Sequence, residues 1–147
     1  FIWYDADPRE VRDFYASIFK DLVTVYEMTV SDGPPVGVAV AIAGKPYVLF
    51  NGGPAHPQTN AFSLAVSADG QDEVDYFWEK LVEGGGAHNV CGWLNDKYGV
   101  AWQIWPSNLS ELLGGPDKAA SQRVHQAVLG MTKLVVADLE AAYRGEA

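Results

Sequence analysis

The sequence predicts an α+β fold made of two βαβββ modules and a C-terminal helical tail. Two observations support this prediction: a strand, a helix and three strands follow one another twice along the chain, and the helices of the two halves align at one fixed offset. The chain has 147 residues, of which 48% are hydrophobic, enough for a sizeable core. We therefore expect a single globular domain over residues 1–147.

The first module covers residues 1–54 and begins with Phe1-Ile-Trp-Tyr, an aromatic and β-branched run typical of a strand. Asp7 and Pro8 then provide a cap and a first position for a helix. Apolar residues at three- and four-residue steps extend this helix to about residue 19. Three further strands are expected over 22–30, 36–43 and 47–50.

The second module covers residues 61–105 and repeats this order. A strand over 62–67 leads to a helix that Asp69 caps and that ends at the glycines 84–86. Setting Phe14 against Phe77 gives an offset of 63, which aligns four other pairs of helix residues as well. These pairs are Glu10 with Glu73, Val11 with Val74, Tyr15 with Trp78, and Ile18 with Leu81. A short strand around 88–94, a turn at 96–99 and a strand over 100–105 complete the module.

The tail, residues 106–147, belongs to neither module. It is expected to form a short helix opened by Asn108 and Glu111, a longer one over 117–129 and a last one over 138–143. The apolar side of such helices needs a partner surface, so the tail either covers the duplicated body or contributes to a dimer.

Composition argues against several classes of function. There are 10 basic and 19 acidic residues, a formal net charge of −9, which repels nucleic acids and anionic membranes. No apolar run is long enough to span a membrane, and the first residues lack the basic-then-apolar pattern of a secretion signal, so neither a membrane span nor export is expected. One cysteine cannot form an internal disulfide, so a cytoplasmic protein is expected.

Several short motifs resemble one known family. Phe14-Tyr15, Phe50-Asn-Gly-Gly-Pro, Cys91-Gly-Trp-Leu, Asp96-Lys-Tyr-Gly and Trp102-Gln-Ile are similar to the PhnB-like branch of the vicinal oxygen chelate superfamily. That superfamily includes glyoxalase I, extradiol dioxygenases and bleomycin-resistance proteins, and this branch often carries the label 3-demethylubiquinone-9 3-methyltransferase. The resemblance implies that two half-cups of four strands, each with its helix outside, pair around a cavity. It also implies a homodimer.

The resemblance further implies where a divalent metal would bind in catalytic members of the superfamily. Those positions fall before Phe1, on Ser63, on Gln103, and on Leu49 or Asn51. None of these residues is a strong metal ligand, so no metal is expected. No cofactor is expected either, because no strand-turn-helix carries the glycine-rich loop that a nucleotide-like group such as S-adenosylmethionine needs.

Strand alternation then predicts which side chains line the cup. The candidates that share parity with the metal-ligand positions, and that are able to bind a ligand, are Tyr4, Asn51, Ser63, Gln103 and Trp105. Residues of opposite parity, such as Trp3, Phe50 and Trp102, are expected beneath the helices. This mixture suits a small, partly aromatic or amphipathic molecule. In the alternative, Tyr4 and Trp105 only fill the cup and Asn51 is a turn residue.

Other reactive side chains give weaker patterns, and no catalytic residue is assigned. Cys91 has His88 three residues upstream, but a cysteine among apolar neighbours is usually a buried small residue. His125 is expected to be structural, His56 lies in the loop between the modules, and Asp5 is either an acid–base group or a helix cap.

Three functions follow from these patterns. The first is a dimeric, glyoxalase-like protein that binds a small organic molecule without a metal. The second is a metal-dependent lyase, isomerase or dioxygenase of the same superfamily, and the third is the methyltransferase that the family label names.

Overall fold

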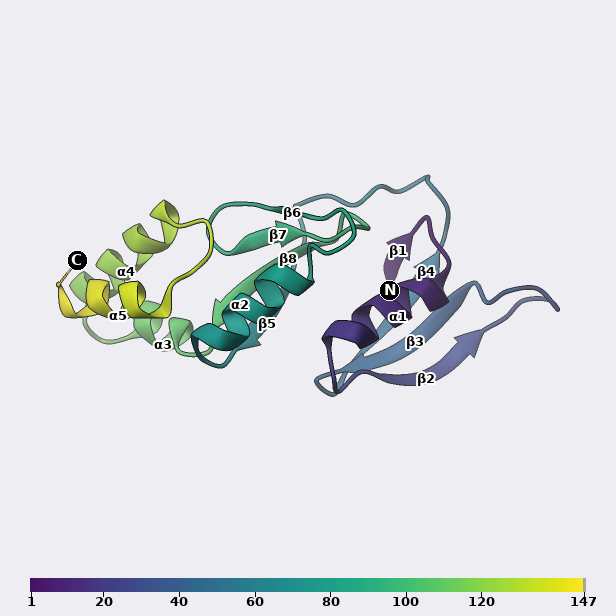
Figure 1. Cartoon of the computed structure of the whole chain (residues 1–147), viewed down its shortest axis with the longest axis horizontal. Helices are drawn as coiled ribbons and strands as arrows, with labels where there is room; N and C mark the ends of the chain where they lie inside the picture. The colour runs from purple at the N-terminus through teal and green to yellow at the C-terminus, as the bar shows by residue number, and fades with distance from the viewer. Residues whose placement is uncertain (147) are drawn as a thin grey trace. The chain divides into compact units, whose positions relative to one another are not determined.

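The computed structural model describes residues 1–146, and the chain forms two compact units, Phe1–Gln58 and a second one from Thr59 onward. Each unit has a four-stranded mixed sheet with one helix packed on it, and the second also holds three further helices (Figure 1). The predicted α+β class, the two βαβββ modules and the helical tail are confirmed. The single domain over 1–147 stays a prediction, and each unit is described by itself.

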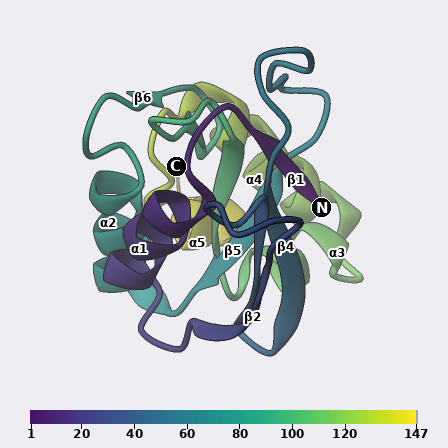
Figure 2. The same cartoon turned by 90° about the vertical axis from the view of Figure 1, so that its right-hand side faces the viewer.

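The first unit follows the predicted element order. Its elements are β1 (Ile2–Tyr4), α1 (Pro8–Ile18), β2 (Val23–Met28), β3 (Gly37–Ile42) and β4 (Lys45–Asn51). The sheet order is β1-β4-β3-β2, with β1 parallel to β4 and the other pairs antiparallel. The Asp7 carboxylate accepts from the Arg9 backbone N–H at 2.9 Å and caps α1, which lies along one side of this sheet (Figure 2).

The faces of this first sheet are the reverse of those expected from the sequence. Tyr4 and Leu49, expected in the cup, are buried toward α1, and the Tyr4 hydroxyl lies 3.1 Å from that of Tyr15 on this helix. Trp3 and Phe50, expected beneath the helix, lie on the open face with ring centroids 5.4 Å apart.

The cause of this reversal is the spacing between strand and helix. β1 ends at Tyr4, ten residues before Phe14, whereas β5 (Leu64–Ala68) ends nine residues before Phe77 on α2 (Gly70–Lys80), so the strand ends are 64 residues apart. The helix offset of 63 therefore does not apply to the strands, and an odd shift along a strand exchanges its two faces.

The open face of the first sheet is apolar and partly hollow. Exposed hydrophobic residues on or beside it include Phe1, Val23, Val25 and Tyr26. Phe1, Val25 and Tyr26 line a hollow of about 320 Å³. The extra residue that Val25 adds to β2 opposite β3 is a β-bulge, which increases the local twist.

The second unit repeats the sheet with one difference. Its remaining strands are β6 (Ala87–His88), β7 (Trp93–Asn95) and β8 (Ala101–Pro106), and the order is β5-β8-β7-β6. The single strand expected around 88–94 is wrong: a turn at residues 89–92 divides it into β6 and β7. Cys91 (φ 59°) and Gly92 (φ 77°) both adopt left-handed backbone there. Their N–H groups donate to the carbonyls of Met131 (2.7 Å) and Thr132 (2.8 Å) in the tail.

The tail is part of the second unit. Helices α3 (Leu109–Gly114), α4 (Lys118–Gly130) and α5 (Val136–Arg144) enclose a core of Leu109, Val124, Leu134 and Leu139, against which Trp105 packs. The tail therefore covers the second module, the first of the two predicted alternatives. Its last predicted residue, Ala147, lies outside the described residues.

Hydrogen bonds and an ion pair also hold the tail to α2. Gln71 donates to the Leu134 carbonyl at 3.3 Å and accepts from the Val136 N–H at 2.8 Å. The Lys133 ammonium lies 2.7 Å from the Asp75 carboxylate. The hydrogen bond from Lys133, followed by that from Gln71, holds the pKa of Asp75 below its ordinary value.

The ion pair between Lys133 and Asp75 should make a small, pH-dependent contribution to stability. Because the folded pKa of Asp75 lies below its unfolded value, the contribution is complete well above pH ~4 and is lost as the pH falls through the folded pKa. Both side chains are more than a third exposed, so Lys133→Met should lower the free energy of unfolding by about 1 kcal/mol or less at pH 7. Urea unfolding at pH 7 and at about pH 3 should show that this difference disappears in acid.

The control is Lys118→Met, since Lys118 donates to the backbone carbonyl of Gly115 rather than to a carboxylate. Its effect should be independent of pH, and a constant effect of Lys133→Met would contradict the assignment.

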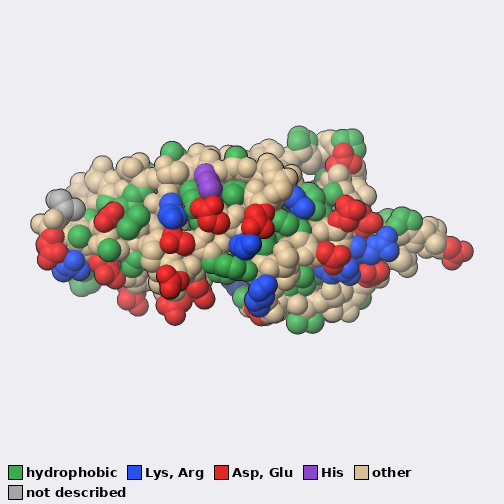
Figure 3. Space-filling model, viewed as in Figure 1, with side chains coloured by type: hydrophobic (Ala, Val, Ile, Leu, Met, Phe, Trp, Pro, Cys, Tyr) green, Lys and Arg blue, Asp and Glu red, His purple; other side chains and the backbone are tan. Residues whose placement is uncertain are grey.

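The charges are dispersed. Acidic side chains are spread over the face seen in Figure 3, with lysines and arginines among them. Across residues 1–146 we find no helix long and apolar enough to cross a membrane.

Candidate functional site

Three of the predicted ligand-binding residues form one hydrogen-bonded chain on the open face of the second sheet. The Trp105 indole N–H donates to the Gln103 amide oxygen at 2.9 Å. The Gln103 amide nitrogen donates in turn to the Ser63 hydroxyl oxygen at 2.7 Å. All three side chains are half-buried. The sheet thus connects a tryptophan, an amide and a hydroxyl group in a fixed order.

The strands explain why these side chains meet. Gln103 and Trp105 are two residues apart on β8 and therefore share a face, opposite that of Trp102 and Ile104, which are buried against the helix side. Ser63 directly precedes β5, whose next residue of the same parity, Ala65, is the register partner of Gln103. For the second sheet, the predicted cup face is therefore correct.

Trp93 belongs to the same face, although it is not among the predicted site residues. It lies directly opposite Gln103 in the β7–β8 register, so their side chains are neighbours. Its strand has only three residues, too short for a clear alternation. The sequence pattern that could have identified it is the hairpin turn at Asp96–Gly99. Pairing residues outward from this turn places Trp93 opposite Gln103.

This face carries no ionisable side chain on β5, β8 and β7. Its members besides Ser63, Gln103, Trp93 and Trp105 are small or neutral: Ala65, Ser67, Asn95 and Ala101. Recognition here depends on hydrogen bonds and on the flat faces of two indole rings, which favours a small and partly aromatic partner.

The other two predicted ligand-binding residues lie in the first unit and serve its structure. The Asn51 side chain accepts from the Gly53 N–H at 3.2 Å and closes a turn after β4. Tyr4 is 3% exposed and hydrogen-bonded to Tyr15. Their role in binding stays a prediction, to which this geometry adds nothing.

The variant Tyr4→Phe distinguishes a structural role of Tyr4 from a role in ligand binding. Losing one buried hydroxyl contact should lower the free energy of unfolding by about 0.5–1.5 kcal/mol in urea titrations and leave ligand affinity unchanged. Tyr26→Phe is the matched control, because Tyr26 is 54% exposed and should show no change. A loss of ligand affinity in Tyr4→Phe without a loss of stability would show that Tyr4 binds the ligand.

The donor set does not fit a divalent metal. Ser63 and Gln103 supply a hydroxyl and an amide that are bonded to each other, and Leu49 is fully buried toward α1. Residues 1–146 contain no group of three or more His, Cys, Asp or Glu side chains suited to hold a metal ion. A site without a carboxylate, imidazole or thiolate is unsuited to Lewis-acid chemistry.

Three other reactive residues, His88, His56 and Cys91, have structural roles. The His88 ring stacks on Trp78 with centroids 4.4 Å apart, and its Nε2 lies 3.0 Å from the Trp78 carbonyl oxygen. His56 packs edge-on against Trp3 at 4.7 Å. The Cys91 backbone holds the tail, as described above.

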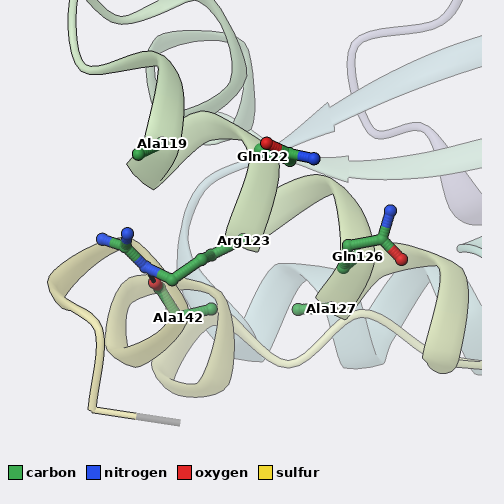
Figure 4. A pocket seen from close by; sticks show the side chains of 6 residues that line it. All are labelled: Ala119, Gln122, Arg123, Gln126, Ala127 and Ala142. Carbon is green, nitrogen blue, oxygen red and sulfur yellow. Dashed lines mark hydrogen bonds between the residues drawn. The ribbon is translucent and has the colours of Figure 1, made fainter.

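A second hollow, of about 660 Å³, lies between α4 and α5 (Figure 4). Arg123, the charged residue among those that line it, donates to the carbonyls of Ala142 (2.8 Å) and Tyr143 (2.6 Å), so its charge stabilises the end of α5. The other lining residues are alanines and two glutamines: Ala119, Gln122, Gln126, Ala127 and Ala142.

Comparison with known proteins identifies the family. The family model described as 3-demethylubiquinone-9 3-methyltransferase matches residues 1–105, both βαβββ modules. The chain belongs to the 3-demethylubiquinone-9 3-methyltransferase family. The predicted membership of the PhnB-like branch of the vicinal oxygen chelate superfamily is thereby confirmed.

Solved structures resemble the chain, including the two that follow. The PhnB protein from Bacillus cereus has 25% sequence identity and a TM-score of 0.62, over 71% of this chain and 95% of its own. A protein from Pseudomonas aeruginosa shares the fold at 18% identity and a TM-score of 0.58, over 71% of this chain and 92% of its own. No curated protein matches the sequence.

The family label implies S-adenosylmethionine, and the glycines present do not fit that group. Gly84–Gly86 follow α2 and precede β6, the reverse of a cofactor-binding strand-turn-helix. A Cβ at Gly86 would lie 2.5 Å from the Asn95 carbonyl oxygen and 2.7 Å from the Val82 Cα. Gly86 therefore permits the close approach of a helix end to a strand.

Proposed function

We propose that this family member is a glyoxalase-like small-molecule-binding protein that acts without a metal, as a homodimer in the cytoplasm. The PhnB-like fold supports binding of a small molecule. The observation that carries the finer proposal is the Trp105–Gln103–Ser63 chain. Two of its members, Gln103 and Ser63, stand at positions where the superfamily resemblance implies metal ligands.

The residue types support binding more than catalysis. An amide and a hydroxyl orient a ligand through hydrogen bonds, but neither is a general acid or base near neutral pH. Trp93 and Trp105 offer flat apolar surfaces beside them. A ligand on this face would be held by aromatic contact and oriented by Gln103 and Ser63.

A thermal-shift screen with a library of small aromatic metabolites and antibiotics tests this proposal. A true ligand at 100 times its Kd should add about 2.7 kcal/mol to the stability of the wild type. Gln103→Leu keeps the size of the side chain but removes both hydrogen-bonding groups, so the same compound should stabilise it far less. The matched control is Gln126→Leu, in the hollow between α4 and α5, which should respond as the wild type does. Absence of any stabilising compound would contradict the proposal.

The two enzymatic alternatives make different predictions. A metal-dependent lyase, isomerase or dioxygenase requires close to one divalent ion per chain in freshly purified protein, where we expect less than about 0.1. A methyltransferase requires measurable binding of S-adenosylmethionine by calorimetry, where we expect none.

The homodimer is tested by light scattering. The molar mass in dilute solution should be twice that of one chain. The apolar side chains exposed on the first unit, such as Val23 and Val25, are of the kind that oligomer interfaces cover.

A further inference from the structure

The hydrogen-bonded chain at Gln103 has a direction, and the direction determines what a ligand must offer. An indole N–H can donate but cannot accept. Because the Trp105 N–H faces the amide of Gln103 at 2.9 Å, the group turned toward it must be the amide oxygen. The amide nitrogen is then fixed on the other side, where it donates to Ser63 at 2.7 Å.

Trp105 is itself held in place, so this orientation is preset. Its ring packs against the core that Leu109, Val124, Leu134 and Leu139 form in the tail. The amide of Gln103 cannot turn over without placing its N–H₂ group against the indole N–H. The tail, by holding Trp105, thereby determines that the Gln103 amide turns its oxygen toward Trp105 and its nitrogen toward Ser63.

Two hydrogens remain for a ligand. The Ser63 oxygen already accepts from Gln103, so its own hydrogen points elsewhere, and Gln103 keeps its second amide hydrogen. Within residues 1–146 the structure records no acceptor for either of them. A ligand that covers this face and offers no acceptor leaves both donors unpaired, at about 1–3 kcal/mol each.

From this we infer that the open face of the second sheet selects neutral, carbonyl-bearing aromatic molecules, with Trp105 as the positioning residue that makes Gln103 a donor. One carbonyl oxygen has two lone pairs and can accept from Gln103 and Ser63 together. An anionic acceptor is disfavoured, because the face has no cation and the protein carries a net charge of −9. The inference rests on the proposed small-molecule function.

Three simple probes of similar size test the inference: acetophenone, benzoate and benzylamine. Titrations followed in ¹H–¹⁵N spectra report on the Gln103 side-chain amide and the Trp105 indole N–H, assigned from Gln103→Leu and Trp105→Phe. Acetophenone should shift both signals and bind about tenfold more tightly than benzylamine, with benzoate weaker than acetophenone. The negative net charge attracts benzylamine, so general electrostatics acts against the expected order.

Variants separate positioning from packing. Trp105→Phe removes the indole donor and frees the amide to turn, so the preference for acetophenone should fall toward onefold. Trp93→Phe, on the same face, should keep it. Gln103→Glu replaces the donor by an acceptor and keeps the side-chain length, so the preference should reverse to benzylamine. This variant keeps the inference testable if Trp105→Phe does not fold.

The outcomes are distinct. Equal binding of benzylamine and acetophenone at the Gln103 and Trp105 signals of the wild type would overturn the donor inference but leave the proposed binding function intact. Tighter binding of benzoate than of acetophenone would overturn the neutral class. If no probe shifts these signals at millimolar concentration, or shifts occur only around the hollow between α4 and α5, the binding proposal fails together with the inference.

Discussion

Asp96→Ala should lower the free energy of unfolding of the second unit by about 3–5 kcal/mol. Asp96 is 3% exposed, and its carboxylate accepts hydrogen bonds that include the following three. The donors are the backbone N–H groups of Tyr98 (2.9 Å) and Val100 (3.1 Å) and the indole N–H of Trp102 (2.9 Å). Alanine would remove the acceptor of all three, two of which fix the turn between β7 and β8. Urea unfolding followed by tryptophan fluorescence measures the loss.

Two variants control this prediction. Asp96→Asn keeps one oxygen for the two backbone donors but loses the acceptor for Trp102, so its effect should be intermediate, about 1–3 kcal/mol. Asp69→Ala removes a carboxylate that makes no capping bond to α2 and should change stability by less than about 0.5 kcal/mol. A stability of Asp96→Ala equal to that of Asp69→Ala would refute the role assigned to this carboxylate.

Leu134→Ala should destabilise the second unit by about 2–5 kcal/mol, as a large-to-small change in a core usually does. Leu134 is fully buried among the tail helices, and it also packs against the sheet: a Cβ placed on Gly92 would lie 3.0 Å from its Cγ. Gly92 in turn accepts at its carbonyl from the Ile104 N–H at 2.8 Å. The loss should therefore reach β8 as well as the tail.

Hydrogen exchange measures this coupling. The Ile104 amide should exchange faster in Leu134→Ala than in the wild type, because the turn that holds its acceptor loosens. Leu129→Ala is the matched control, since Leu129 lies on α4 and is 54% exposed. Unchanged Ile104 exchange in a destabilised Leu134→Ala protein would mean that the tail folds independently of the sheet.

Residue periodicity predicts the helices of this chain well. Val11, Tyr15 and Ile18 are buried on α1, and Val74, Trp78 and Leu81 at the same spacing on or beside α2. A helix stripe depends on residues within one segment, so it survives changes in the connections. The Asp7 cap and the turn at Gly99, with φ 83°, are local in the same way.

Features that depend on the length of a connection, or on contacts distant in sequence, could not be predicted. The face that Tyr4 takes depends on the length of the connection to α1, which the helix repeat does not report. The left-handed backbone at Cys91 is unusual for a residue other than glycine, and the bonds that support it come from Met131 and Thr132, forty residues later. At the candidate site, parity placed Ser63, Gln103 and Trp105 together, but neither the order of their hydrogen bonds nor the neighbour Trp93 followed from it.

A crystal structure of the protein with its tightest compound from the library screen tests the central claim most directly. We expect the compound to lie on the open face of the second sheet between Trp93 and Trp105, with an acceptor atom about 2.7–3.2 Å from the Gln103 amide nitrogen or the Ser63 hydroxyl oxygen. A compound bound elsewhere, such as between α4 and α5 with Gln103 and Ser63 uncovered, would contradict the claim.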